Sequence, residues 1–103
     1  MKDKVLNYMG LAARGRMLVN GYNTCMFMAG KGKIKLIIRA EDLAENSMKK
    51  MVSLAVRHNI PYIVYGTKEV LSHRTGNVEA GIFGVTDENL AAAISKEIDH
   101  RKS

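Results

Sequence analysis

Four consecutive residues in the basic first part of the chain carry groups suited to contacting nucleic acid. They supply a side-chain amide, a hydroxyl and an aromatic ring at a turn that leads into a predicted helix. Amide and hydroxyl groups hydrogen-bond to base edges, and the free N–H groups of a helix start attract phosphate. We call these residues the helix tip, and they are the first candidate for a nucleic-acid site: Gly21, Tyr22, Asn23 and Thr24.

The positive charge of the chain is concentrated in its first forty residues. Eight of the sixteen lysines and arginines lie there beside a single acid, Asp3, whereas nine acids outnumber the other eight basic residues from Glu41 onward. Each basic side chain that replaces a condensed counterion on phosphate adds affinity, so the asymmetry predicts docking onto a polyanion. The basic residues expected to adjoin the helix tip, with the first two as candidate RNA contacts, are Lys31, Lys33, Lys35 and Arg39.

Two aromatic residues lie in the same region. Tyr22 is equally consistent with stacking on a base and with filling the core, whereas Phe27 is expected in the core. The apolar residues that follow Tyr22 fit the buried side of a short helix that begins with Asn23 or Thr24 as its cap and ends near Gly30.

Patterns that would support catalysis are weak. The glycine pair in residues 29–33 follows a predicted helix and opens a strand, which is the reverse of a phosphate-binding turn, and the pair in 10–16 lacks the lysine and hydroxyl of a P-loop. Both are interpreted as helix C-terminal caps. Glu41 and Asp42 follow a predicted strand and are interpreted as capping carboxylates rather than an acid pair. No catalytic residue and no cofactor are therefore predicted.

Cysteine and histidine usage predicts no metal site. Cys25 is the only cysteine and lies on the apolar side of a predicted helix, where a thiol usually behaves as a small buried hydrophobe. The three histidines are far apart in the sequence, which does not match the spacing of zinc ligands. A lone cysteine among seven methionines is typical of a reducing compartment, so we expect a cytoplasmic protein.

Length and hydropathy predict a single soluble domain over residues 1–103. The composition is 47% apolar, which is enough for one core of ordinary size. No apolar run reaches the about 18 residues that a membrane-spanning helix needs, so no membrane partner is expected.

Helical and strand patterns alternate along the chain. Residues 36–38 form a continuous apolar run, typical of a strand that is covered on both faces. Alternating elements predict an α/β fold, a three-layer α-β-α sandwich around a mixed, largely parallel sheet. Helices are predicted over 3–13, to Gly30, from Asn46 or Ser47 to about 57, after a cap at Gly66-Thr67 and from Asp87 onward, with strands at 17–19, 36–38, 62–65 and 82–85.

The order and spacing of short segments along nearly the whole chain match a known superfamily. These segments are the helix tip, Lys31-Gly32, residues 35–42, 59–62 and 67–71, and Gly76. In them the chain resembles the kink-turn-binding ribosomal proteins, the L7Ae-like superfamily, and is most similar to its small bacterial members of the YlxQ type. The resemblance implies an α-β-α sandwich that binds a sharply bent RNA with tandem sheared G·A pairs.

The resemblance also implies roles for individual residues. The helix tip would enter the groove at the bend, where Asn23 matches a base-reading asparagine. Lys31 and Lys68 would contact the RNA backbone. A second loop, containing Asn77 and Val78, would pack on an extruded nucleotide, with Met48 as an apolar neighbour.

Some positions depart from the family pattern. Thr24 stands where members usually carry glutamate, and Phe27 stands where they carry lysine. The second loop has one apolar residue, Val78, followed by the acid Glu79. A bidentate base contact is worth about 1 to 3 kcal/mol, so the departures predict weaker or redirected recognition.

The predicted function is noncatalytic recognition and stabilisation of a bent, structured RNA. Ribosomal RNA and an mRNA leader are the RNA classes considered, with the ribosome as the assembly to test, and no DNA partner is expected. The residues leave two alternatives open. One is a protein-interaction subunit of a ribonucleoprotein that uses its methionine-rich helix faces, and the other is a small hydrolase or transferase that uses Glu41 and Asp42.

Overall fold

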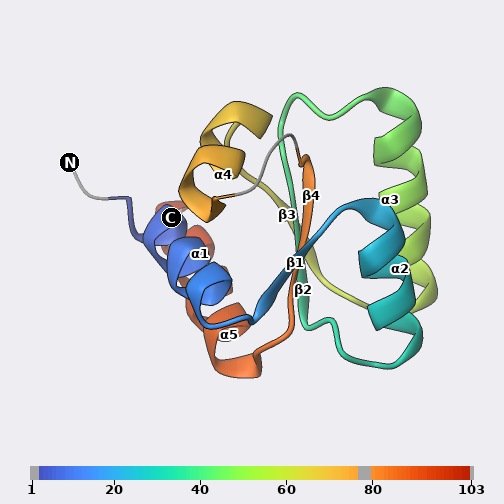
Figure 1. The fold of residues 1–103 in the computed structure, drawn as a ribbon, viewed down its shortest axis with the longest axis horizontal. Helices are drawn as coiled ribbons and strands as arrows, with labels where there is room; N and C mark the ends of the chain where they lie inside the picture. Colours follow the sequence, from blue (N-terminus) through green and yellow to red (C-terminus); the bar gives the residue numbers. More distant parts are fainter. Residues whose placement is uncertain (1–2, 77–79, 103) are drawn as a thin grey trace.

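A computed structural model describes residues 3–76 and 80–102 (Figure 1). Helices and strands alternate along these residues, as the sequence pattern predicted. In chain order the elements are α1 (Lys4–Arg14), β1 (Leu18–Asn20), α2 (Tyr22–Gly30), β2 (Leu36–Arg39), α3 (Glu45–Arg57), β3 (Tyr62–Val64), α4 (Lys68–Thr75), β4 (Ile82–Val85) and α5 (Glu88–Lys102).

The strands form one mixed sheet in the order β1-β4-β2-β3. The prediction of a mixed sheet is confirmed, but the prediction that it is largely parallel is wrong. Only β2 and β3 are parallel, because β4 runs antiparallel to both of its neighbours. The difference arises in the connection through α4. After this helix the chain is still at the end of the sheet where β3 stops, so β4 starts at that end and runs back. The longer helix α3 returns the chain to the other end and produces the parallel pair.

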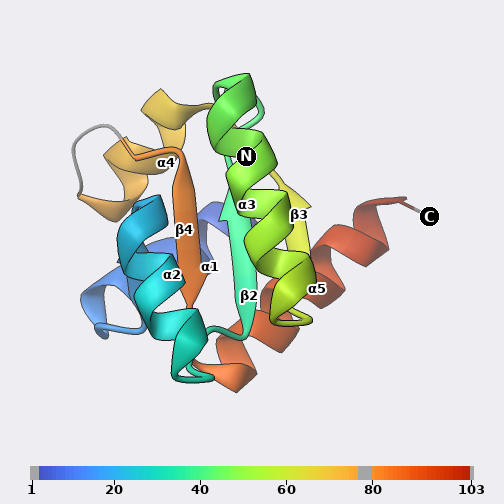
Figure 2. The ribbon, with the colours of Figure 1, turned by 90° about the vertical axis from the view of Figure 1, so that its right-hand side faces the viewer.

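Helices cover both faces of this sheet (Figures 1 and 2). Helices α2 and α3 lie side by side on one face, and α1, α4 and α5 lie on the other. Strand β2 is buried on both faces, as its continuous apolar run predicted: Leu36 and Ile38 belong to the cluster under α1, α4 and α5, and Ile37 belongs to the cluster under α2 and α3. The largest fully buried side chain is Phe83 of β4.

The start of α2 differs from the prediction. The helix begins at Tyr22 with Gly21 as its N-cap, so Asn23 and Thr24 lie in the first turn and do not cap it. Gly21 has φ 86° and ψ 149°, a conformation that is almost confined to glycine, and this sets the chain direction into the helix. Most other boundaries shift by one or two residues; for example, α3 begins at Glu45, and β1 covers Leu18–Asn20 at the edge of the sheet.

One end of the sheet collects the starts of three helices. At this end Asn20 pairs with Phe83, and Arg39 lies between Ile82 and Val64. Helices α2, α3 and α4 follow β1, β2 and β3, so all three begin toward this end; in Figure 1 α3 and α4 begin at the top and α2 begins below them. We call this the upper end of the sheet. Among the described residues, no helix combines the length and the apolar character needed to cross a bilayer.

Candidate nucleic-acid interface

The helix tip lies at the upper end of the sheet with its backbone donors open. The Gly21 N–H donates to the Ile82 carbonyl at 2.8 Å, which fixes the tip to β4, and the Cys25 N–H donates to the Gly21 carbonyl at 3.1 Å as the helix begins. Gly21 has no side chain to cap α2, and no other side-chain oxygen of the described residues caps it either. The first-turn amides and the positive end of the helix dipole therefore face outward, which favours an anion.

Three other helices, α1, α4 and α5, have a side-chain cap at their start. The Asp3 carboxylate accepts from the Leu6 N–H at 3.0 Å, the Thr67 hydroxyl accepts from the Val70 N–H at 3.2 Å, and the Asp87 carboxylate accepts from the Leu90 N–H at 2.8 Å. The cap predicted at Thr67 is thereby confirmed. Only α2 and α3 lack such a cap among the described helices whose caps are defined, and both start at the upper end.

The side chains of the tip divide into an exposed pair and a packed ring. Asn23 and Thr24 are exposed, and their side chains make no hydrogen bond within the described structure. The Tyr22 ring is half-buried and packs against the cluster under α2 and α3, where the Lys50 ammonium lies 5.9 Å from the ring centre. Of the two roles left open for Tyr22, packing is the one observed in the free protein.

Two further predicted site residues lie at the upper end. Met48 is half-buried in the first turns of α3, and its N–H donates to the Ala44 carbonyl at 2.8 Å. Lys68 is the first residue of α4, and its stem passes close to Gly81, where an added Cβ would lie 3.2 Å from the lysine Cγ and Cδ. Both residues lie at the upper end, and Lys68 is the closer to the helix tip, because Gly81 precedes Ile82, whose carbonyl accepts the Gly21 N–H. Asn77 and Val78 lie outside the described residues.

The predicted lysine cluster lies elsewhere. Lys31 is the C-cap of α2, and the Lys35 N–H donates to the carbonyl of Val85, the last residue of β4, at 2.8 Å. At 1.5 Å per helical residue, Lys31 is about 12 Å from Asn23. The expectation that these lysines adjoin the helix tip is wrong because α2 runs away from the upper end. We call the exposed cations at its far end the basic loop: Lys31, Lys33 and Lys35.

Arg39 is separated from the basic loop. It ends β2 at the upper end, half-buried, with Nη1 donating to the Ala40 carbonyl at 3.1 Å. The sequence pattern grouped Arg39 with Lys33 and Lys35 on one strand face, but the two lysines precede the strand, which begins at Leu36.

An exposed face of α2 connects the helix tip to the basic loop. Its residues recur every three to four positions, as one side of a helix requires. The expectation that Phe27 lies in the core is wrong, because the side chain is 61% exposed. Cys25 and Ala29 form the buried side, and a residue two positions after Cys25 points about 200° away. The exposed face consists of Asn23, Met26, Phe27, Gly30 and Lys31.

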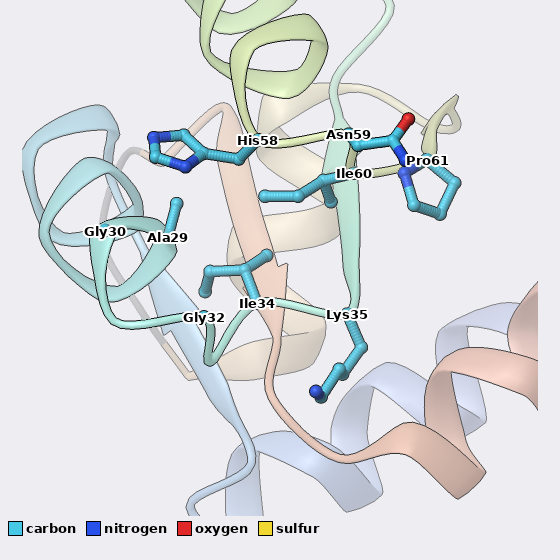
Figure 3. A pocket seen from close by; sticks show the side chains of 9 residues that line it. All are labelled: Ala29, Gly30, Gly32, Ile34, Lys35, His58, Asn59, Ile60 and Pro61. Atoms are coloured by element: carbon cyan, nitrogen blue, oxygen red, sulfur yellow. The ribbon is translucent and has the colours of Figure 1, made fainter.

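A pocket of about 450 Å³ opens beside the basic loop, between the ends of α2 and α3 (Figure 3). The side chains of Ile34, Ile60 and His58 point toward Ala29, and the Lys35 side chain runs away from them. The lining holds no carboxylate and no thiol, so it does not assemble a nucleophile with a base or an acid pair.

The carboxylate of Asp42 has a structural partner. Its Oδ1 accepts from the Lys68 N–H at 2.9 Å, so it caps the start of α4 from a loop 26 residues earlier in the chain. This agrees with the interpretation of Asp42 as a capping carboxylate, although the helix is α4 and not the one that follows it. A carboxylate at a helix start is stabilising through both the hydrogen bond and the dipole.

Replacing Asp42 by alanine is expected to lower the free energy of unfolding by about 0.5 to 1 kcal/mol, because the Lys68 N–H loses its acceptor. Urea denaturation monitored by circular dichroism measures this change. The neighbouring substitution Glu41→Ala is the control, since only the backbone of Glu41 is bonded, to the Gly66 carbonyl. Equal stability of the Asp42→Ala variant and the wild type would show that the cap is not formed in solution.

The remaining groups capable of nucleophilic or metal chemistry are not assembled into a site. Cys25 is fully buried, and burial raises the pKa of its thiol to about 12. No group of three or more histidine, cysteine, aspartate or glutamate side chains is placed to hold a metal ion within the described residues. The candidate site is therefore formed by the upper end of the sheet and the exposed face of α2.

The chain is similar to known proteins in both sequence and fold. A model of the ribosomal protein L7Ae/L30e/S12e/Gadd45 family matches residues 3–94. The chain is 26% identical over 91 residues to the RNA-binding protein YlxQ of Bacillus subtilis (strain 168), covering 88% of this chain and 91% of that protein. It is 24% identical over 98 residues to the RNA-binding protein YlxQ of Enterococcus faecium, covering 95% and 94%.

Many solved structures are similar in fold, and two of them illustrate the likeness. A protein of unknown function from Bacillus halodurans C aligns with a TM-score of 0.90 at 28% identity, covering 95% of this chain and 99% of that chain. The 15.5kD RNA binding protein of Giardia lamblia aligns with a TM-score of 0.80 at 18% identity, covering 97% and 92%, a likeness of fold alone.

Proposed function

The chain belongs to the ribosomal protein L7Ae/L30e/S12e/Gadd45 family, and from this premise we propose that it is a noncatalytic protein that binds and stabilises a bent, kink-turn-like RNA. The observation that carries the proposal is the helix tip, an uncapped helix start with two exposed polar side chains at the end of the sheet where two further helices begin. The names of the two curated relatives, both RNA-binding proteins, support the same ligand class.

In this proposal the upper end binds the bend of the RNA. The A-form major groove is normally too deep and narrow for side chains, and a sharp bend opens it to a helix start. Asn23 reads a base edge, Thr24 adds a hydroxyl beside it, and Lys68 holds the backbone. Met48 supplies apolar contact at the same end. The roles of Asn77 and Val78 on an extruded nucleotide belong to the proposal on the strength of the family resemblance.

The basic loop holds a second part of the RNA. Lys31, Lys33 and Lys35 are exposed, and no ion pair of the described residues involves them. Lys31 is about 12 Å from Asn23, so the basic loop contacts phosphates away from the bend, and an RNA that reaches both sites follows the exposed face of α2. Because the protein binds the bent conformer more tightly, it acts by shifting the RNA population toward that conformer. Ribosomal RNA in the cytoplasm is the first RNA to test.

Asn23→Ala and Lys31→Ala separate base reading from phosphate contact. Asn23→Ala is expected to weaken binding to a bent RNA more than to a plain duplex of the same length, because a base contact is lost. Lys31→Ala is expected to weaken both and to lower the slope of log K against log salt by about one unit. Filter binding at several salt concentrations measures both effects. Equal losses on both RNAs for both variants would contradict these roles.

The alternative of a protein-interaction subunit is not favoured by the placement of the methionines. Met9 and Met51 are fully buried, so they fill the core and form no surface. Met26 is exposed, but it lies on the face of α2 that connects the helix tip to the basic loop.

A further inference from the structure

Phe27 is an exposed aromatic ring between the two proposed RNA contacts. It lies one helical turn after Asn23 and one turn before Lys31, on the exposed face of α2. The Lys31 ammonium lies over the ring, 4.4 Å from its centre. The ring therefore presents a flat apolar surface, 61% exposed, with a cation beside it.

The charge around this ring favours a nucleic-acid occupant over a protein. The sequence from Lys4 to Ala40 contains no aspartate or glutamate, so neither α2 nor the basic loop carries an acid. Apolar surface next to Phe27 is limited on this face to Met26. A ring flanked by cations is the combination by which proteins bind unpaired nucleotides, since the base stacks on the ring and the cation binds the phosphate.

The contact between Lys31 and Phe27 can be exchanged for RNA contacts. An exposed cation–π contact is weaker than the stacking of a base on an aromatic ring. A base can therefore replace the ammonium over the ring, and the released ammonium can bind a phosphate of the same strand.

We propose that Phe27 is a stacking platform for an unpaired base of the bound RNA, with Lys31 on an adjacent phosphate. This rests on the proposed function and adds to it a nucleotide site on the side of α2, between the bend and the basic loop. It also gives a physical role to the aromatic residue that stands where family members usually carry lysine.

The probe is an RNA duplex interrupted by a bulge next to tandem sheared G·A pairs, compared with the same duplex without the bulge. Phe27→Ala is expected to bind the bulged RNA about 5- to 150-fold more weakly than the wild type, the usual effect of removing one stacked base contact. Phe27→Tyr keeps the ring and should bind like the wild type, whereas Phe27→Leu keeps apolar character and should lose affinity. Val56→Ala, at a 73% exposed position on α3, is the matched control.

Abasic nucleotides identify the stacked base. When the stacked base is removed, the wild type should bind as weakly as Phe27→Ala binds the intact RNA, and combining both changes should add no further loss. Because the side chain is exposed, the melting temperature of each variant should match that of the wild type, which separates a binding loss from a folding loss.

The outcomes distinguish this inference from the proposed function. If the wild type prefers the bulged RNA but Phe27→Ala binds it equally well, the stacking platform is wrong while the proposed function stands, and the ring is left for a protein partner. Equal losses on the bulged and plain duplexes would also overturn the platform. If the wild type shows no preference for the bulged RNA, the proposed function fails and the platform fails with it.

Discussion

A variant in which Lys31, Lys33 and Lys35 are all replaced by glutamine is expected to bind bent RNA about 100- to 500-fold more weakly at 0.1 M salt, with a salt slope lower by about 2 to 3 units. The physical reason is counterion release, because each lysine that contacts a phosphate frees condensed cations from the RNA. All three side chains are exposed and lie together at the far end of α2. Fluorescence anisotropy over a range of salt concentrations measures the affinity and the slope together.

The control removes the same amount of charge from other surfaces. Lys49, Arg57 and Lys96 are exposed on α3 and α5, and their replacement by glutamine changes the net charge equally. Lys49 already has a partner, the Glu45 carboxylate at 3.5 Å. This triple variant is expected to lose much less affinity and slope. If both triple variants lose affinity equally, the RNA responds to net charge alone and the basic loop is not a contact.

The sequence pattern singled out these lysines as a basic cluster, but it predicted the wrong position for them relative to the helix tip. The charge asymmetry identified the basic residues, and their proximity in sequence to the helix tip suggested one cluster. The structure separates them by the length of α2 because the helix starts at the upper end and leads away from it. Distance along a helix is readable from the number of residues, so a predicted helix to Gly30 already implied about 12 Å.

Local signals predicted most of the elements. Thr67 caps α4, the run at 36–38 is the buried strand β2, and the glycine-containing segments at 10–16 and 29–33 end helices. The start of α2 was missed because Asn23 and Thr24 are favourable caps, whereas the cap observed is Gly21, chosen by backbone conformation. The spacing of Cys25 and Ala29 could have shown that Phe27 points outward.

Contacts between residues far apart in the sequence could not be predicted from local sequence patterns. The Asp42 carboxylate caps a helix that begins 26 residues later, and no spacing rule predicts such a partner. The direction of β4 depends on the end of the sheet at which the chain emerges from α4, and the alternation of helices and strands does not specify that end. Both features lie at the upper end. There Asp42 caps the start of α4, and the carbonyl of Ile82, the first residue of β4, accepts the N–H of Gly21 in the helix tip.

Cys25 carries the one thiol of the chain, and its surroundings make that thiol unreactive. The side chain is fully buried, and a Cβ added at Gly84 would lie 3.1 Å from its Sγ, so the thiol packs closely against β4. Burial disfavours the thiolate and raises the pKa from 9.0 to about 12. The thiol therefore stays protonated throughout the neutral range, and the thiolate is the reactive form.

Alkylation of Cys25 by iodoacetamide at pH 8 is expected to be at least about a thousandfold slower in the native protein than in urea, because a pKa of about 12 in place of 9.0 lowers the thiolate fraction by that factor. Mass spectrometry of samples quenched over time measures both rates. Raising the pH should keep increasing the native rate for as long as the fold is retained, whereas the rate in urea should level off above about pH 9. A native rate within tenfold of the rate in urea would show an accessible, activated thiol and would favour a catalytic function.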